Sequence, residues 1–115
     1  TALVRGAFEY QGQKCSAASR AYIPANLWEE VKSYMLTDLK EIKMGSVEDF
    51  SCFFNAVIDE KSFNKLAEYI DNAKKDDGVT VVAGGNYDKS KGYFIEPTIL
   101  QVQDPMYVIM QEEIF

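Results

Sequence analysis

The apolar run Val79–Ala83 is the segment that most limits the fold of this 115-residue chain. Its five residues are β-branched or small and Gly84-Gly85 ends it, which is typical of a short strand buried in a sheet. Residues 93–102 also have an extended pattern, but Pro97 lacks the N–H that a ladder needs. This second segment is therefore predicted to be discontinuous or an edge strand. The sheet that these segments form needs further partners.

Two segments upstream of this strand have apolar residues at helical spacing. The first follows Pro24, and Asn26 with Glu29 predicts a capping pair at its start. The second begins at Asp59 and is closed by residues 74–78. The apolar positions are Leu27, Val31, Met35, Leu39 and Ile42 in the first segment and Phe63, Leu66, Ile70 and Ala73 in the second.

The order of the predicted elements indicates an α/β fold. A short strand is expected at residues 21–23, whereas residues 50–57 fit neither the strand period nor the helix period. Strands separated by helices, without internal repeats, favour a sheet flanked by helices. The sequence stops at Phe115 without a cap or a polar tail, so we expect a cut through a longer chain.

Composition argues against several classes of protein. The formal net charge of -6, with twelve dispersed Lys and Arg residues, argues against a nucleic-acid partner. No apolar run approaches the roughly 18 to 20 residues that span a bilayer, so no membrane partner is expected. The chain has no His, and Cys15 and Cys52 lie far apart, which argues against a metal site and against a Cys-His pair. Gly84-Gly85 lacks the spacing of a dinucleotide fingerprint and is predicted to be a turn.

Cys15 is the residue whose surroundings point to chemistry. Gly12 permits a turn before it, and residues 14–20 are helix-compatible, so Cys15 is predicted at a helix start. There the helix dipole, free backbone N–H groups and Lys14 would favour a thiolate and stabilise an oxyanion. A cysteine beside small residues is more often a core residue, so spacing alone leaves both interpretations open. Cys52, among aromatic residues, is expected to be packed.

Three segments, in order, resemble the aldehyde dehydrogenase superfamily. Residues 8–17 are similar to the segment in which a glycine-glutamine pair precedes the nucleophilic cysteine. Residues 92–98 and 112–115 are similar to two later family segments at about the family's spacing. The resemblance covers nearly the whole chain. It implies that residues 1–115 are part of the catalytic domain, truncated at both ends, with a Rossmann-like open sheet and flanking helices.

One branch of the family is the most similar. Lys14 and Ser16 beside the cysteine, and the pattern of residues 49–63, resemble the branch that oxidises glutamate semialdehyde to glutamate in proline catabolism. This resemblance implies NAD as the cofactor and a small aldehyde as the substrate. Two alternatives stay open: another family member that acts on a different aldehyde, such as betaine aldehyde, and a non-catalytic interaction module in which Cys15 is structural.

The resemblance implies a role for five residues. Cys15 is the nucleophile that forms a thiohemiacetal and then a thioester, and its backbone N–H contributes to the oxyanion hole. Glu113 holds the nicotinamide-ribose hydroxyls and Phe115 packs near the nicotinamide ring. Ser16 and Lys14 lie near the carboxylate end of the substrate.

The resemblance also implies that this chain needs the rest of a longer protein. In the family, the water-activating glutamate, the oxyanion-hole asparagine and most adenosine contacts lie outside such a segment. We therefore expect the isolated chain to be inactive and either poorly soluble or self-associating. For the longer protein, the family implies a dimer or larger assembly, in the mitochondrial matrix of a eukaryote or the cytoplasm of a bacterium.

Overall fold

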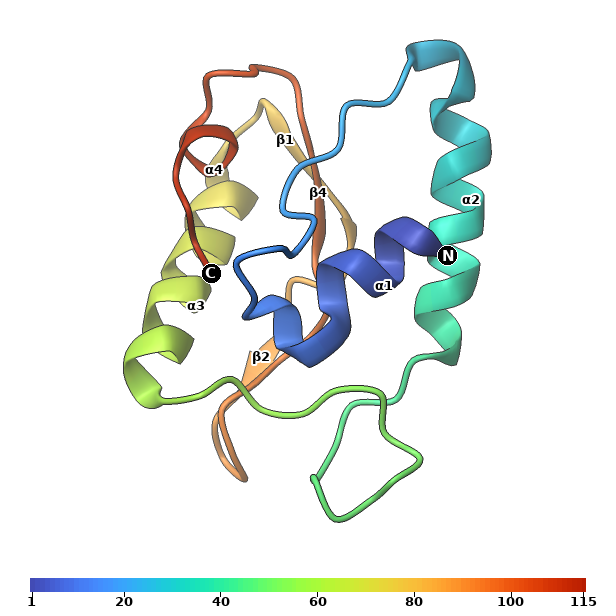
Figure 1. Cartoon of the computed structure of the whole chain (residues 1–115). Coiled ribbons are helices and arrows are strands. Elements are labelled where there is room, and N and C mark those ends of the chain that lie inside the picture. The colour runs from blue at the N-terminus through green and yellow to red at the C-terminus, as the bar shows by residue number, and fades with distance from the viewer. The chain divides into compact units, whose positions relative to one another are not determined.

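The computed structural model describes all 115 residues and divides them into two compact units. The first unit comprises Thr1–Asn55 together with Phe115, and the second comprises Ala56–Ile114. Helices dominate the first unit, whereas the second contains a long helix and two small sheets (Figure 1).

The first unit is built on two helices. Helix α1 spans Ala2–Phe8 and continues into a short 3-10 helix, η1, at Glu9–Gly12, and helix α2 spans Ala25–Glu41. The two α-helices are in contact (Figure 1). Their buried apolar residues are Val4 on α1 and Met35 on α2. We had no sequence prediction for α1, although its apolar residues recur at helical spacing.

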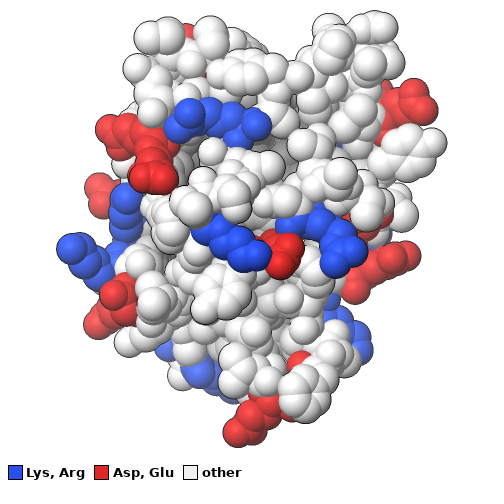
Figure 2. Space-filling model, viewed as in Figure 1, with Lys and Arg blue, Asp and Glu red and all other residues white.

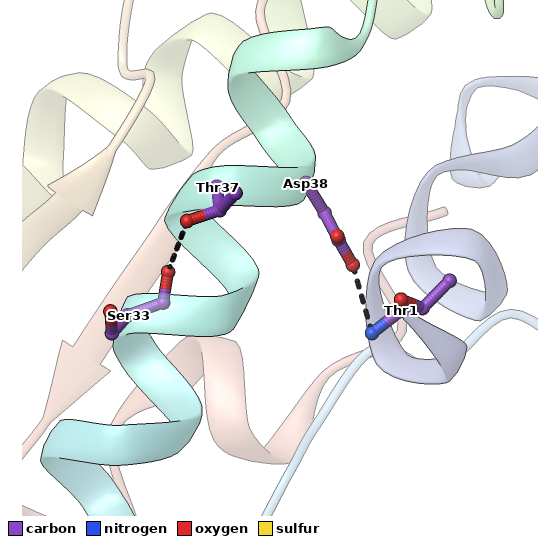
Figure 3. A network of polar contacts seen from close by, with 4 residues as sticks. All are labelled: Thr1, Ser33, Thr37 and Asp38. Atoms are coloured by element: carbon purple, nitrogen blue, oxygen red, sulfur yellow. Dashed lines mark hydrogen bonds and ion pairs between the residues drawn. The ribbon is translucent and has the colours of Figure 1, made fainter.

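Polar contacts also join these helices. The amino group of Thr1 pairs with Oδ2 of Asp38 at 2.8 Å, and this hydrogen bond lowers the pKa of Asp38 (Figure 3). Within α2, Oγ1 of Thr37 donates to the carbonyl of Ser33 at 3.0 Å. This bond ties the Thr37 side chain to its own helix, whereas Asp38 binds the amino group at the start of α1.

The capping pair predicted for α2 is wrong. The helix begins at Ala25 with Pro24 as its N-cap, and the N–H of Leu27 donates to the Pro24 carbonyl at 2.9 Å. Proline suits this place because its fixed φ matches the entry to a helix and it has no N–H to satisfy. Asn26 therefore lies inside the first turn, and Glu29 pairs instead with Lys32 at 2.7 Å.

The predicted strand at residues 21–23 is also absent. These residues pair with no other strand, and a segment without a ladder partner is not a strand however extended its side-chain pattern is. The predicted irregularity of residues 50–57 is confirmed, with one isolated bridge between Met44 and Phe54. On α2, the predicted apolar face is buried at Met35, whereas Leu27 is exposed.

Two antiparallel strand pairs form the sheets of the second unit. Strand β1, Val79–Ala83, pairs with β4, Ile99–Val102, and strand β2, Tyr87–Asp88, pairs with β3, Phe94–Ile95. The strand predicted at residues 79–83 and the interruption predicted at Pro97 are confirmed, since β3 ends before that proline and β4 begins after it. Most side chains of β1 are half-buried, because the sheet has only two strands.

The long helix α3, Glu60–Lys75, provides most of the core of the second unit. It contacts β1 and β3, and its buried residues follow the predicted apolar face. Phe63 packs edge-to-face on Tyr87, with ring centroids 5.6 Å apart, and joins Val57 and Ala67 in one buried cluster. This packing confirms the helical periodicity.

The Gly84-Gly85 turn between β1 and β2 is held by close backbone contacts. Gly84 has a φ of +68°, and a Cβ built there would lie 2.1 Å from the Pro97 carbonyl oxygen, so only glycine fits. The N–H of Gly85 donates to Oγ1 of Thr98 at 2.9 Å, and Lys74 donates to the Gly85 carbonyl. The turn therefore holds β1 against the segment before β4, as a structural feature.

The fold class predicted from the sequence is confirmed as a mixed arrangement of helices and small open sheets. No helix is long and apolar enough to cross a membrane. On the face that Figure 2 shows, Lys and Arg side chains alternate with Asp and Glu side chains, with uncharged surface between them.

The N-cap of α3 gives a pH-dependent prediction. Oδ1 of Asp59 accepts the N–H of Ser62 at 2.7 Å, and this bond lowers the pKa of Asp59. The folded pKa lies below the unfolded one, so the stability contributed by the carboxylate is present above the unfolded pKa and is lost as pH falls through the folded pKa. We expect Asp59→Ala to lower the urea midpoint of the full-length protein at neutral pH.

Asp59→Asn is the matched control, because asparagine caps a helix about as well but does not titrate. Its urea midpoint should equal that of the wild type at neutral pH and should fall less steeply toward about pH 3. Identical pH profiles for the wild type and Asp59→Asn would show that the cap does not depend on the charge of Asp59.

Candidate active site

Cys15 lies in an exposed turn of the first unit. The N–H of Ala17 donates to the carbonyl of Lys14 at 3.1 Å, which closes the turn over Cys15 and Ser16. The predicted helix start at Cys15 is therefore wrong, because α1 lies before the cysteine and no helix follows until α2. The reason is a tertiary contact: the N–H of Ala18 donates to the carbonyl of Gly6 in α1 at 2.9 Å.

The turn is preceded by three consecutive residues in the left-handed region. The φ angles are 55° at Tyr10, 60° at Gln11 and 70° at Gly12. A Cβ on Gly12 would lie 2.8 Å from the carbonyl oxygen of Ala7, so this position requires glycine for space as well as for its φ angle. Non-glycine residues are rarely left-handed, and such strained backbone concentrates at functional sites. The sequence had indicated a turn here but not its strain.

The side chain of Gln11 stabilises this strained segment. With its amide oriented to satisfy both groups, Gln11 donates to the carbonyl of Tyr10 at 3.0 Å and accepts the N–H of Asn55 at 2.6 Å. The N–H of Gln13 also donates to the Tyr10 carbonyl, at 3.1 Å. These bonds fix the path of the chain into the cysteine turn.

Lys14 spans the strained segment through an ion pair. Its Nζ donates to Oε1 of Glu9 at 2.8 Å, and this hydrogen bond lowers the pKa of Glu9. Both side chains are partly exposed, so the pair leaves the lysine accessible to solvent. Sequence reasoning missed this partner because a separation of five residues matches no helical pairing.

The exposure of Cys15 and Ser16 decides what the turn can do chemically. An exposed thiol can reach an electrophilic carbon in a bound molecule, whereas a packed one cannot. The adjacent hydroxyl of Ser16 and the ammonium of Lys14 are both hydrogen-bond donors, which suits an anionic group on the same molecule. The turn thus combines one nucleophile with two donors.

Cys52 has a different environment from Cys15. It is half-buried, and its Sγ lies 2.7 Å from where a Cβ on Gly45 would stand. Partial burial raises the pKa of the Cys52 thiol, and its hydrogen bond to the Asp49 carboxylate raises it further. A thiol held protonated in this way is a poor nucleophile, which agrees with the packed role expected for it.

Glu113 lies in the second unit, just after the short helix α4, Val108–Gln111. It is exposed, and its carboxylate has no hydrogen-bonding or charged partner. The segment that carries it is tied to α3: Nζ of Lys65 donates to the carbonyls of Glu113 at 3.4 Å and of Ile114 at 3.1 Å, and the hydroxyl of Tyr69 donates to the Glu112 carboxylate. No sequence pattern indicated these hydrogen bonds, because the partners are 43 to 49 residues apart.

Phe115 groups with the first unit, which also holds Lys14, Cys15 and Ser16, whereas Glu113 belongs to the second. The ring of Phe115 is 53% exposed and so offers an apolar surface to a partner. The structure therefore brings three of the five predicted site residues into one turn. The roles that the resemblance implies for all five stay predictions.

Comparisons with known proteins identify the family to which this chain belongs. A sequence model of the aldehyde dehydrogenase family matches residues 1–115, and the chain belongs to this family. Among the relatives is the mitochondrial delta-1-pyrroline-5-carboxylate dehydrogenase of Dictyostelium discoideum, which is 54% identical over 112 residues. That match covers 97% of this chain and 20% of the relative, so the chain spans about one fifth of the length of the curated relatives it matches.

Comparisons with solved structures agree with this family assignment. The delta-pyrroline-5-carboxylate dehydrogenase of Mycobacterium tuberculosis bound with NAD is 46% identical, with a TM-score of 0.84 over 92% of this chain and 20% of that one. The NAD⁺ complex of an aldehyde dehydrogenase from Bacillus cereus is 30% identical, with a TM-score of 0.89 over 98% of this chain and 23% of that one. The family resemblance read from the sequence is thereby confirmed, and the matched structures share this fold.

Proposed function

We propose that this chain is the cysteine-bearing part of an enzyme that oxidises glutamate 5-semialdehyde, the open form of delta-1-pyrroline-5-carboxylate, to glutamate with NAD. The observation that carries the proposal is the 54% identity, over nearly the whole chain, to a relative named for that substrate. The enzyme would serve proline breakdown.

Sequence, more than shape, supports this choice of substrate. The Bacillus cereus aldehyde dehydrogenase superposes slightly better than the Mycobacterium tuberculosis enzyme, with TM-scores of 0.89 and 0.84, although it is less identical. Overall shape therefore does not separate one branch of the family from another, and side chains on the fold select the aldehyde. This similarity keeps another aldehyde as the second candidate.

In the proposed reaction, Cys15 is the catalytic residue. Its thiolate attacks the aldehyde carbon, and the carbonyl oxygen becomes the oxyanion of a thiohemiacetal that the Cys15 N–H stabilises. NAD, when bound, accepts the hydride from this carbon. The resulting thioester on Cys15 is hydrolysed by water, which releases glutamate and the free thiol. The exposed turn supports this role, because a nucleophile must be accessible to its substrate.

The substrate's carboxylate end would lie near Ser16 and Lys14. Ser16 donates a hydrogen bond and Lys14 supplies a positive charge that its partly exposed pair with Glu9 leaves accessible. An aldehyde without a carboxylate would gain nothing from these two side chains. The arrangement thus favours an acidic aldehyde.

The residues proposed for the cofactor fit its chemistry. The Glu113 carboxylate has free acceptor sites and can accept hydrogen bonds from both hydroxyls of a ribose. Phe115 offers an exposed ring that can limit the positions of a nicotinamide. These two residues would hold the nicotinamide half of NAD.

The alternative of a non-catalytic interaction module is less well supported. A structural cysteine is expected to be packed, and Cys52 is half-buried whereas Cys15 is exposed. The strained backbone before Cys15 is also more costly than a purely structural loop needs.

For the whole protein we propose an assembly of two or more copies. In a eukaryote its place would be the mitochondrial matrix, in line with the Dictyostelium relative, which is named as mitochondrial. In a bacterium it would be the cytoplasm.

Substrate preference in the full-length enzyme tests the proposal. With NAD, kcat/KM should be at least about tenfold higher for glutamate semialdehyde than for an uncharged aldehyde of similar length. Lys14→Met should raise KM for the semialdehyde and leave KM for the uncharged aldehyde unchanged.

Lys32→Met is the matched control for Lys14→Met, because Lys32 also forms an exposed pair with a glutamate, Glu29, but on α2. It should change neither KM. A preference for betaine aldehyde or an uncharged aldehyde would be compatible with the proposed thioester mechanism but would contradict the proposed substrate.

A further inference from the structure

We propose that Tyr69 is a positioning residue for the cofactor: its hydrogen bond to Glu112 holds the turn that presents the Glu113 carboxylate to the nicotinamide ribose. The inference rests on the proposed function, in which Glu113 accepts hydrogen bonds from that ribose. Tyr69 itself touches neither the substrate nor the cofactor in this account.

Glu112 is held at both its backbone and its side chain. Its N–H donates to the carbonyl of Val108 at 3.0 Å, which closes the last turn of α4. Its carboxylate accepts the hydroxyl of Tyr69 on α3, and this bond raises the pKa of Tyr69, because it stabilises the protonated hydroxyl that donates it. The side chain of Glu112 therefore points toward α3, and the neighbouring carboxylate of Glu113 stays free.

The carbonyls of the two residues after Glu112 are also hydrogen-bonded to α3. Nζ of Lys65 donates to the carbonyls of Glu113 and Ile114, at 3.4 and 3.1 Å. Lys65 and Tyr69 are one helical turn apart on α3, so they form adjacent anchors on one face. With both anchors in place, the backbone on either side of the Glu113 side chain is fixed to a helix whose apolar residues are buried in the core.

These hydrogen bonds affect cofactor binding, because a short segment without them samples many conformations. Ordering that segment when a ligand binds costs conformational entropy. The hydrogen bond from the Tyr69 hydroxyl orders the segment before the cofactor binds and so reduces this entropy cost. Its loss should weaken the interaction with the nicotinamide ribose and leave the adenosine half of the cofactor unaffected. This difference separates positioning of Glu113 from a general structural role.

The test compares ligand binding by the full-length enzyme and its Tyr69→Phe variant, by calorimetric titration with NAD, ADP-ribose and AMP. NAD and ADP-ribose both carry the second ribose, and AMP lacks it. We expect Tyr69→Phe to weaken binding of NAD and ADP-ribose by about three- to tenfold, as loss of one hydrogen bond predicts, and to leave AMP binding unchanged. In steady-state assays, KM for NAD should rise by the same factor.

Tyr87→Phe is the matched control. The hydroxyl of Tyr87 donates to Oδ2 of Asp71 on α3 at 2.7 Å, so the variant loses the same kind of bond in the same unit without touching the Glu113 segment. It should bind all three ligands as the wild type does. Equal weakening of AMP and NAD in Tyr69→Phe, or no change in either, would overturn the inference while wild-type turnover with NAD still supports the proposed function. A wild type that does not bind NAD would overturn both.

Discussion

Replacing Cys15 by alanine in the full-length enzyme should reduce turnover of glutamate semialdehyde by roughly a thousandfold or more. The thiolate forms the bond to the substrate, so its removal eliminates the covalent route to the thioester. NADH formation, followed by absorbance, measures the loss. Binding of NAD should persist in the variant, because the residues proposed for the cofactor, Glu113 and Phe115, are unchanged.

Cys52→Ala provides the control for this experiment. Cys52 is half-buried and its pKa is raised, so its removal should cost a little stability and leave kcat/KM unchanged. Activity that survives in Cys15→Ala, or that disappears in Cys52→Ala, would contradict the assignment of the nucleophile.

The second large effect is expected for Gly12→Ala. The new Cβ would meet the carbonyl oxygen of Ala7 at 2.8 Å and would sit on a residue with a φ of +70°. Strain and overpacking together should lower the free energy of unfolding by about 2 to 3 kcal/mol. Because the Cys15 turn follows three residues later, its displacement should also lower kcat by about tenfold or more. Thermal unfolding and steady-state kinetics of the full-length enzyme measure the two effects.

Gly6→Ala is the matched substitution, made in the middle of α1. Its Cβ would contact the Cβ of Ala18 at 3.6 Å, an ordinary van der Waals distance, and its φ is that of a helix. An alanine there should be neutral or stabilising by about 0.5 to 1 kcal/mol. If Gly12→Ala behaved like Gly6→Ala, the left-handed backbone before Cys15 would be refuted.

The elements that the sequence predicted well are those whose stabilising contacts are local or periodic. The start of α3 after Asp59 and the apolar face of that helix follow from side chains that recur at helical spacing. Pro97 interrupts the extended segment because it has no N–H, a property of the residue itself. Each of these predictions needed no knowledge of distant residues.

The predictions that were wrong concern segments whose conformation depends on a distant partner. Residues 14–20 are helix-compatible, but the N–H of Ala18 donates to the carbonyl of Gly6 rather than to a carbonyl within the segment. Residues 21–23 have the composition of a strand and no partner to pair with. Asn26 is a good N-cap by type, yet the helix begins at Ala25, because Pro24 already provides the entry.

The motifs around Cys15, at residues 92–98 and at residues 112–115 identify the family from the sequence alone, because covalent order and spacing carry that information. The tertiary structure decides how those residues are presented. It shows the cysteine in an exposed turn after a left-handed segment, Lys14 paired with Glu9, and the Glu113 segment tied to Lys65 and Tyr69. These contacts join residues up to 49 positions apart, and their geometry depends on where helices and turns bring the backbone. No local sequence pattern predicts contacts between residues so far apart in the chain.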